Sequence, residues 1–286
     1  MADSANQSGN KGPRAKVRFL PREHGATAML FTPIVCAGIL ARQWHWSELA
    51  TLTAAFAALA AKDPMVVLAR QWLVWKQPHP ETRDAAQWFA GWMALLILSG
   101  IVLIATWPMK ATVALGAGVG VFSALAILVN VKNRQRSTLF QIVSALALTS
   151  SSLATCLSAT GAIAPWCWGL WLLLAMQATA GILVVHARLD ARIAARIALR
   201  GTAAGSEQFR RAAWIALGVM VSAAIAAVVL SRGWIALALV VAVMGYTHDL
   251  RRQRDAAALQ MPLKSVGQRA LALSSVFAGL LILGLW

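Results

Sequence analysis

Residues 88–107 read WFAGWMALLILSGIVLIATW, a run of 20 residues without an ionisable side chain. A helix of that length is about 30 Å long, which is the thickness of the hydrocarbon core of a bilayer. Eight further stretches have the same apolar character. The sequence therefore predicts an all-α, polytopic membrane helical bundle with about nine transmembrane helices. The predicted spans are residues 25–41, 49–74, 88–107, 111–130, 137–160, 164–185, 212–230, 233–247 and 269–286.

The composition agrees with a membrane protein. Hydrophobic residues make up 59% of the 286-residue chain and charged residues only 13%. A soluble domain of this length would need far more polar surface to cover its core. The formal net charge of +16 could indicate a nucleic-acid partner, but the basic residues are scattered through short loops between the apolar runs. Membrane topology explains that distribution, so we expect the lipid bilayer as a partner and no nucleic acid.

The basic residues sort to one side of the predicted spans. The loops on the other side hold only Arg42, Lys110 and Arg232, and Lys62 lies within a span. Because Lys and Arg are retained on the cytoplasmic side, the N-terminus is predicted to be cytoplasmic. An odd number of spans then places the C-terminal Trp286 outside. We expect a multi-pass protein of the bacterial cytoplasmic (inner) membrane.

The chain is predicted to contain one folded domain. Residues 1–20 are polar and form a disordered cytoplasmic tail in this interpretation, and residues 21–286 form a single transmembrane helical domain. The three cysteines, Cys36, Cys156 and Cys167, have no paired spacing. We interpret them as packing residues, because neither a metal site nor a disulfide framework fits that spacing.

The second predicted span contains charges at membrane depth. Lys62 and Asp63 directly precede Pro64, and Arg70 follows two turns later. Each charge costs about 2.5–3.5 kcal/mol on insertion scales unless it is paired or hydrated. Proline removes a backbone donor, so the pattern predicts a broken helix whose charges line a binding cavity. The alternative is a structural Lys62–Asp63 pair within the bundle.

The sixth predicted span ends in a second polar group. His186 and Asp190 are four residues apart on one helix face, the spacing at which a carboxylate can orient an imidazole, and Arg188 lies between them in the sequence. The arginines that follow are typical of a surface helix that contacts anionic headgroups. His186, Arg188 and Asp190 lie closer to the lipid boundary and are candidates for a site.

Three more polar groups lie at the same predicted membrane face. Helix capping explains part of the group at residues 22–24, and anchoring of the positive loops is an alternative for the group at residues 133–134. The hydroxyl run at residues 149–152 lies mid-span and is more typical of close helix packing. The three groups contain Arg22, Glu23 and His24; Asn133 and Arg134; and Tyr246 and His248.

These five groups come from different spans and all lie toward the cytoplasmic side. A mouth rich in arginine, lysine and histidine suits an anionic group such as phosphate, diphosphate or carboxylate. The sequence therefore predicts one shared anion-binding cavity at that face.

The same residues resemble a known family. The chain after residue 20 is similar to the YwiC-like integral membrane proteins of bacteria, a resemblance that implies a topology more than an activity. The residues that carry it are Arg22-Glu23-His24-Gly25 with Pro33, Lys62-Asp63-Pro64, the turn Arg134-Gln135-Arg136-Ser137, and residues 186–192.

A weaker likeness is to the UbiA superfamily of intramembrane prenyltransferases. Those enzymes also have nine helices, with polar motifs after the second and sixth helices on the cytoplasmic side. They use paired aspartates to hold magnesium on a diphosphate. This chain has one carboxylate in each corresponding place, Asp63 and Asp190, which is a thin shell for Mg²⁺ unless waters and substrate oxygens complete it. The analogy is one of architecture, and fold alone does not establish chemistry.

Two functions from different classes follow. The first is an intramembrane lipid-handling enzyme, a UbiA-like transferase acting on a phosphate- or diphosphate-bearing lipid. Its candidate metal or carbocation contacts are Asp63 and Asp190, its phosphate contacts Lys62, Arg70 and Arg188, and its proton carrier His186 or His24. The second is a transporter of a small anion, and a non-catalytic scaffold is a third. The apolar outer halves of the spans favour the first. The sequence names neither a cofactor beyond this Mg²⁺ option nor an oligomeric state.

Overall fold

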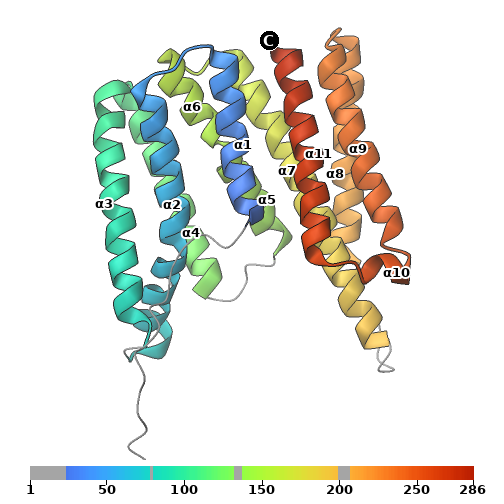
Figure 1. Ribbon diagram of the computed structural model, residues 1–286, viewed down its shortest axis with the longest axis horizontal. Coiled ribbons are helices and arrows are strands. Elements are labelled where there is room, and N and C mark those ends of the chain that lie inside the picture. The colour runs from blue at the N-terminus through green and yellow to red at the C-terminus, as the bar shows by residue number, and fades with distance from the viewer. Residues whose placement is uncertain (1–23, 78–79, 132–136, 199–206) are drawn as a thin grey trace, which may run out of the picture.

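A computed structural model describes residues 24–77, 80–131, 137–198 and 207–286, and in this part of the chain every regular element is helical (Figure 1). Eight helices are long and apolar enough to span a membrane, and residues Gly25–Ala41 form a shorter apolar helix. The predicted all-α membrane bundle is therefore confirmed. The elements are α1 (His24–Ala41), α2 (Trp46–Arg70), η1 (Gln71–Trp75), α3 (Thr82–Thr106), α4 (Met109–Val131), α5 (Thr138–Thr149), α6 (Ser151–Thr160), α7 (Pro165–Ala198), α8 (Gln208–Val229), α9 (Gly233–Arg252), α10 (Ala256–Leu259) and α11 (Leu263–Leu285).

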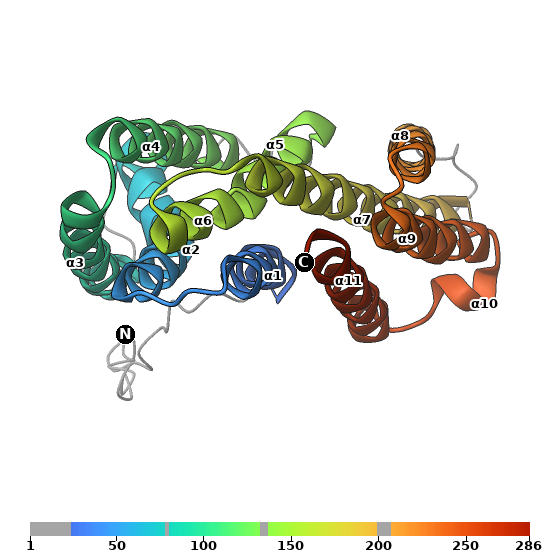
Figure 2. The same ribbon diagram turned by 90° about the horizontal axis from the view of Figure 1, so that it is seen from above.

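The helices form two groups joined by α7. Seen along the bundle, α2, α3 and α4 lie on one side and α8, α9 and α11 on the other, with α1, α5 and α6 between them (Figure 2). The main hydrophobic core joins α1, α6, α7, α8, α9 and α11, and includes Leu170, Met220, Leu239 and Phe277. In contrast, α3 and α4 bury little of their apolar surface, as expected for helices that face lipid.

We call one end of the bundle the basic end. There α2, α7 and α9 finish and α3, α8 and α11 begin, at the bottom of Figure 1. It carries Arg70, Arg188, Arg252 and Arg269. The distribution of basic residues in the sequence predicts that this end faces the cytoplasm. The opposite end is called the far end.

The fifth predicted span consists of two helices that meet at Ser150. Thr149 Oγ1 donates to the carbonyl of Ala145 at 2.7 Å and Ser150 Oγ to that of Ala147 at 2.7 Å. Such bonds back to the preceding turn bend helices, which explains the break. Ser151 Oγ donates to the Leu30 carbonyl of α1 at 2.9 Å, so this hydroxyl ties two closely packed helices together.

The predicted break at Pro64 is wrong. Helix α2 runs without interruption from Trp46 to Arg70 with Pro64 inside it. Pro64 is fully buried, and packing against neighbouring helices keeps the axis continuous although the proline supplies no backbone donor. The irregular segment is the π-helix η1, which follows directly after Arg70. It ends at Lys76, a left-handed residue with φ 52°.

Replacing Pro64 with alanine should therefore leave the fold intact. Alanine restores a donor and improves helix propensity by about 3 kcal/mol, whereas the smaller side chain loses buried packing worth roughly 1–3 kcal/mol. We expect Pro64→Ala to unfold at the wild-type temperature or above it. Thermal unfolding can be followed with a thiol-reactive fluorophore, because Cys36, Cys156 and Cys167 are free and buried. A clear fall in the unfolding temperature would show that the proline itself shapes α2.

Several helices extend beyond the predicted spans. Helix α7 continues to Ala198, α9 continues to Arg252, and α11 begins at Leu263. Hydropathy marks where the chain crosses apolar lipid, whereas backbone hydrogen bonding continues through polar residues beyond it. The extension of α9 decides the site, because it places residues 246–252 on a regular helix.

Candidate functional site

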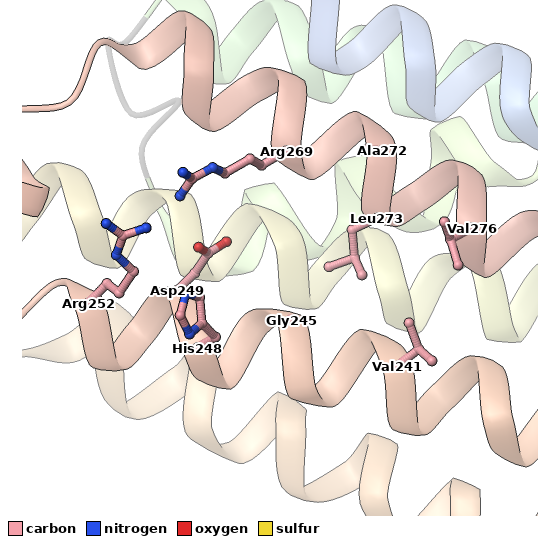
Figure 3. A pocket seen from close by; sticks show the side chains of 9 residues that line it. All are labelled: Val241, Gly245, His248, Asp249, Arg252, Arg269, Ala272, Leu273 and Val276. Carbon is pink, nitrogen blue, oxygen red and sulfur yellow. The ribbon is translucent and has the colours of Figure 1, made fainter.

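A groove of about 390 Å³ lies between α9 and α11 at the basic end (Figure 3). One half of its lining is apolar and the other half is ionisable. The apolar half runs toward the middle of the bundle, and the ionisable half opens at the helix ends. The lining residues are Val241, Gly245, His248, Asp249, Arg252, Arg269, Ala272, Leu273 and Val276.

Helical spacing brings the α9 residues of the groove together. His248 and Asp249 lie three and four residues after Gly245, and Arg252 lies four and three residues after them, so these residues share a face of α9. Gly245 is needed for the close approach of α11, because a Cβ there would lie 2.8 Å from Leu273 Cδ2. Small residues at such positions are how membrane helices pack tightly.

The ionisable half has an excess of positive charge. In Figure 3 the side chains of Asp249, Arg252 and Arg269 all reach into the same mouth. Arg188 of α7 is near these side chains, because Asp249, Arg252 and Arg269 all act on it electrostatically. We call these four residues the basic cluster. Three guanidinium groups with one carboxylate leave a net positive charge for an anion.

Arg188 and its neighbour Arg192 bind the backbone of the short helix α10. Arg188 Nη2 donates to the Ala258 carbonyl, and Arg192 donates through Nε to the Leu259 carbonyl and through Nη2 to the Met261 carbonyl, the last at 2.7 Å. These carbonyls lie at or just beyond the C-terminal end of α10, where no further helical turn supplies donors. The predicted phosphate contact Arg188 therefore has a structural role in addition to any role in a site.

Tyr246, a predicted substrate contact, is buried away from the groove. Gln177 Nε2 donates to Tyr246 Oη at 2.7 Å and to Ser274 Oγ at 2.7 Å, which links α7, α9 and α11. Tyr246 Oη in turn donates to the Gln177 carbonyl at 3.3 Å. His248, two residues further along α9, lines the groove and is exposed.

The remaining α7 candidates face a different neighbour. The His186 ring stacks on Phe209 of α8, with centroids 4.8 Å apart and an interplanar angle of 22°. Asp190 follows one turn later and is half-buried. Neither residue lines the groove between α9 and α11.

The α2 candidates lie in the other helix group. Lys62, Asp63 and Arg70 are half-buried on α2, which packs mainly on α3 (Figure 2). The basic-end half of α7 lies beside α8 and α9 in the same view. Within the described residues no group of three or more His, Cys, Asp and Glu side chains could hold a metal ion. The arrangement thus gives two separate polar regions at the basic end and leaves the α2 region outside the groove.

Four of the predicted contacts lie outside the described residues: Arg22, Glu23, Asn133 and Arg134. His24 begins α1, and its side chain is also outside what the structure describes.

Arg252 and Arg269 line the groove but are not among the site residues predicted from the sequence, which places both in the positive loops. The spacing of Gly245, His248, Asp249 and Arg252 could have indicated that Arg252 shares their helix face. That indication requires a helix that continues past residue 247. Arg269 offered no local signal, since its place at the groove depends on how α11 packs on α9.

Comparison with known proteins finds a family match over slightly less than half of the chain. Residues 20–156 match the family model described as YwiC-like protein, which covers α1 to the middle of α6. The resemblance drawn from the sequence is confirmed over these residues, while the stretch at residues 186–192 lies beyond the match. Neither the curated proteins nor the solved structures gave a match to the chain.

Proposed function

We propose that this YwiC-like membrane protein binds an anionic, lipid-like molecule, with its phosphate or diphosphate group at the basic cluster. The observation that carries the proposal is the polarity gradient of the groove between α9 and α11. Arg252 and Arg269 lie at its mouth, and Val241 and Val276 lie deeper along the same helices. An amphiphile would match both halves, with its headgroup on the arginines and its chain along the apolar wall.

Asp249 is the one carboxylate of the basic cluster. The three guanidinium groups outnumber it, and the remaining positive charge attracts the ligand. The exposed His248 adds a ring N–H that can donate to a phosphate oxygen. Binding at this groove does not require a metal ion, since guanidinium groups neutralise phosphate directly.

A UbiA-like transfer reaction remains a narrower version of the proposal. It would need the carboxylates Asp63 and Asp190 near the bound headgroup, and neither lines the groove. We therefore propose binding, not transfer, at this place. The small-anion transporter is the main alternative, because the same arginines would attract an inorganic anion.

The test is a binding measurement on purified full-length protein by native mass spectrometry. The probes are phosphatidic acid, farnesyl diphosphate, phosphatidylcholine and inorganic diphosphate. We expect the two anionic amphiphiles, phosphatidic acid and farnesyl diphosphate, to bind. Arg252→Ala and Arg269→Ala should each weaken their affinity about tenfold, because each variant loses one charge-assisted hydrogen bond. Arg251→Ala is the matched control, because Arg251 is exposed on the same helix and does not line the groove.

Each outcome has a defined meaning. Equal losses in the Arg251→Ala control and the two groove variants would overturn the proposal, since only general surface charge would then matter. Binding of inorganic diphosphate as tight as that of farnesyl diphosphate would favour the transporter, because the apolar wall would contribute nothing.

A further inference from the structure

Glu48 is a buried carboxylate at the far end of the bundle that no part of the proposed function uses. It lies in the first turn of α2 and is 3% exposed. Its Oε1 accepts a hydrogen bond from the backbone N–H of His45 at 3.3 Å, which is a helix-capping contact. Its Oε2 is buried and has no hydrogen-bond partner among the described residues. Capping therefore explains one oxygen of this carboxylate and leaves the other unexplained.

The bare oxygen is enclosed by protein backbone and an indole. A Cβ added at Gly38 of α1 would lie 3.4 Å from Glu48 Oε2 and 3.1 Å from the Trp44 ring. Glycine at position 38 thus lets α1 pass directly against the carboxylate. The glycine and the indole beside it leave no room for a bulky counter-ion at this oxygen.

Among the described residues, no lysine or arginine acts electrostatically on Glu48. His45, on the loop before α2, is the ionisable neighbour that acts on it electrostatically. On α6 the neighbour is the Cys156 thiol, which is hydrogen-bonded to Cys167 of α7. Arg42 lies 3.8 Å above the Trp286 ring, and Lys110 at the start of α4 is exposed.

A polar groove opens close to this carboxyl group. A second groove, of about 540 Å³, opens at the far end and is lined by polar side chains that include His45, Ser47 and Thr160. Ser47 and His45 flank the start of α2, so the groove begins within one turn of Glu48. His45 is therefore both a wall of the groove and the direct partner of the carboxylate.

Leaving a carboxylate ionised in these surroundings is costly. An uncompensated charge buried in protein costs several kcal/mol, and a proton is the one cation small enough to sit on the enclosed oxygen. We propose that Glu48 is a proton-binding site, loaded from the far end through the groove beside His45. This inference is independent of headgroup binding at the basic end, because the two sites lie at opposite ends of the helices.

Dicyclohexylcarbodiimide provides a direct test. This apolar reagent adds to protonated carboxyl groups in water-poor surroundings and gives a stable acylurea. Purified full-length protein in liposomes is treated at acidic, neutral and alkaline pH, and the peptides are analysed by mass spectrometry. We expect Glu48 to be labelled, with labelling that falls about tenfold per pH unit once the group titrates. The variant Glu48→Gln should give no label at this peptide and should fold, because glutamine keeps the acceptor for His45.

Glu207 is the matched control within the same protein. Its side chain is 61% exposed and forms a surface pair with Arg210. A water-soluble carbodiimide with glycinamide should modify Glu207 and spare Glu48, the reverse of the apolar reagent. If the Glu48 peptide is detected but carries no label at any pH, or if the water-soluble reagent labels Glu48 as readily as Glu207, the proposal is overturned. Labelling by the apolar and by the water-soluble carbodiimide are both measured on the wild-type protein, so the test does not depend on the folding of a variant.

Discussion

Replacing Gly181 with alanine should lower the unfolding temperature markedly, although alanine is the better helix former. A Cβ at position 181 would lie 2.8 Å from Tyr246 Oη, at the rigid end of an aromatic ring. The ring must move, and the move breaks its hydrogen bonds with Gln177. Overpacking costs roughly 1–3 kcal/mol and a buried unsatisfied polar group about 1–3 kcal/mol, against a propensity gain of about 1 kcal/mol.

Gly218→Ala is the control for this variant. Gly218 also lies inside a helix, but a Cβ there would meet nothing within 4 Å. We expect Gly218→Ala to leave the unfolding temperature unchanged or to raise it. The double variant Gly181→Ala with Tyr246→Phe should recover part of the loss, because removing Oη relieves the contact. Equal unfolding temperatures for Gly181→Ala and the control would mean that α7 and α9 are not packed as described.

Removing Arg188 should release α10 and the chain on either side of it. The guanidinium is 5% exposed and donates to the Ala258 carbonyl. A hydrogen bond to a charged group contributes about 1.5–3 kcal/mol, and truncation also leaves a cavity. We expect Arg188→Ala to accelerate amide hydrogen exchange over residues 253–262, while the apolar core exchanges as in the wild type.

Two further variants separate the causes of this effect. Arg188→Met fills most of the volume without a donor, so fast exchange in that variant would assign the effect to the hydrogen bond. Arg210→Ala removes an arginine from an exposed pair with Glu207, 3.5 Å apart, and should change stability by at most about 1 kcal/mol. Protection of residues 253–262 that is unchanged in Arg188→Ala would show that α10 is held by other contacts.

The fold class was accessible from the sequence, whereas half of the site was not. Of the predicted span 88–107, residues 88–106 lie within α3, and Trp107 is the C-cap of that helix. The boundaries of α7 and α9 were set too early, because charged residues continue a helix after it leaves the apolar layer. The predicted break at Pro64 was wrong because proline disfavours a helix interior only as a local tendency. Burial of Pro64 between neighbouring helices keeps α2 continuous.

Candidate residues were found where polarity interrupts an apolar span, as at Lys62, Asp63 and Arg188. Glu48 is also a charge within an apolar span, but the sequence did not predict it as a site residue. A glutamate in the first turn of a helix is equally typical of an ordinary helix cap. The expectation of one shared cavity was only partly right. The groove between α9 and α11 holds His248 with Arg188 near it, while Lys62, Asp63 and Arg70 lie in the other helix group.

The sequence by itself determined that this chain is a bundle of membrane helices. Each span is stable in lipid through its own length and composition, and its backbone hydrogen bonds close within the segment, so the evidence is local. Which polar side chains meet was decided only by the tertiary structure. Contacts between helices depend on where small residues such as Gly38, Gly181 and Gly245 let two backbones approach, and the partners are far apart in the chain. The basic cluster and the bare oxygen of Glu48 both arise from that packing.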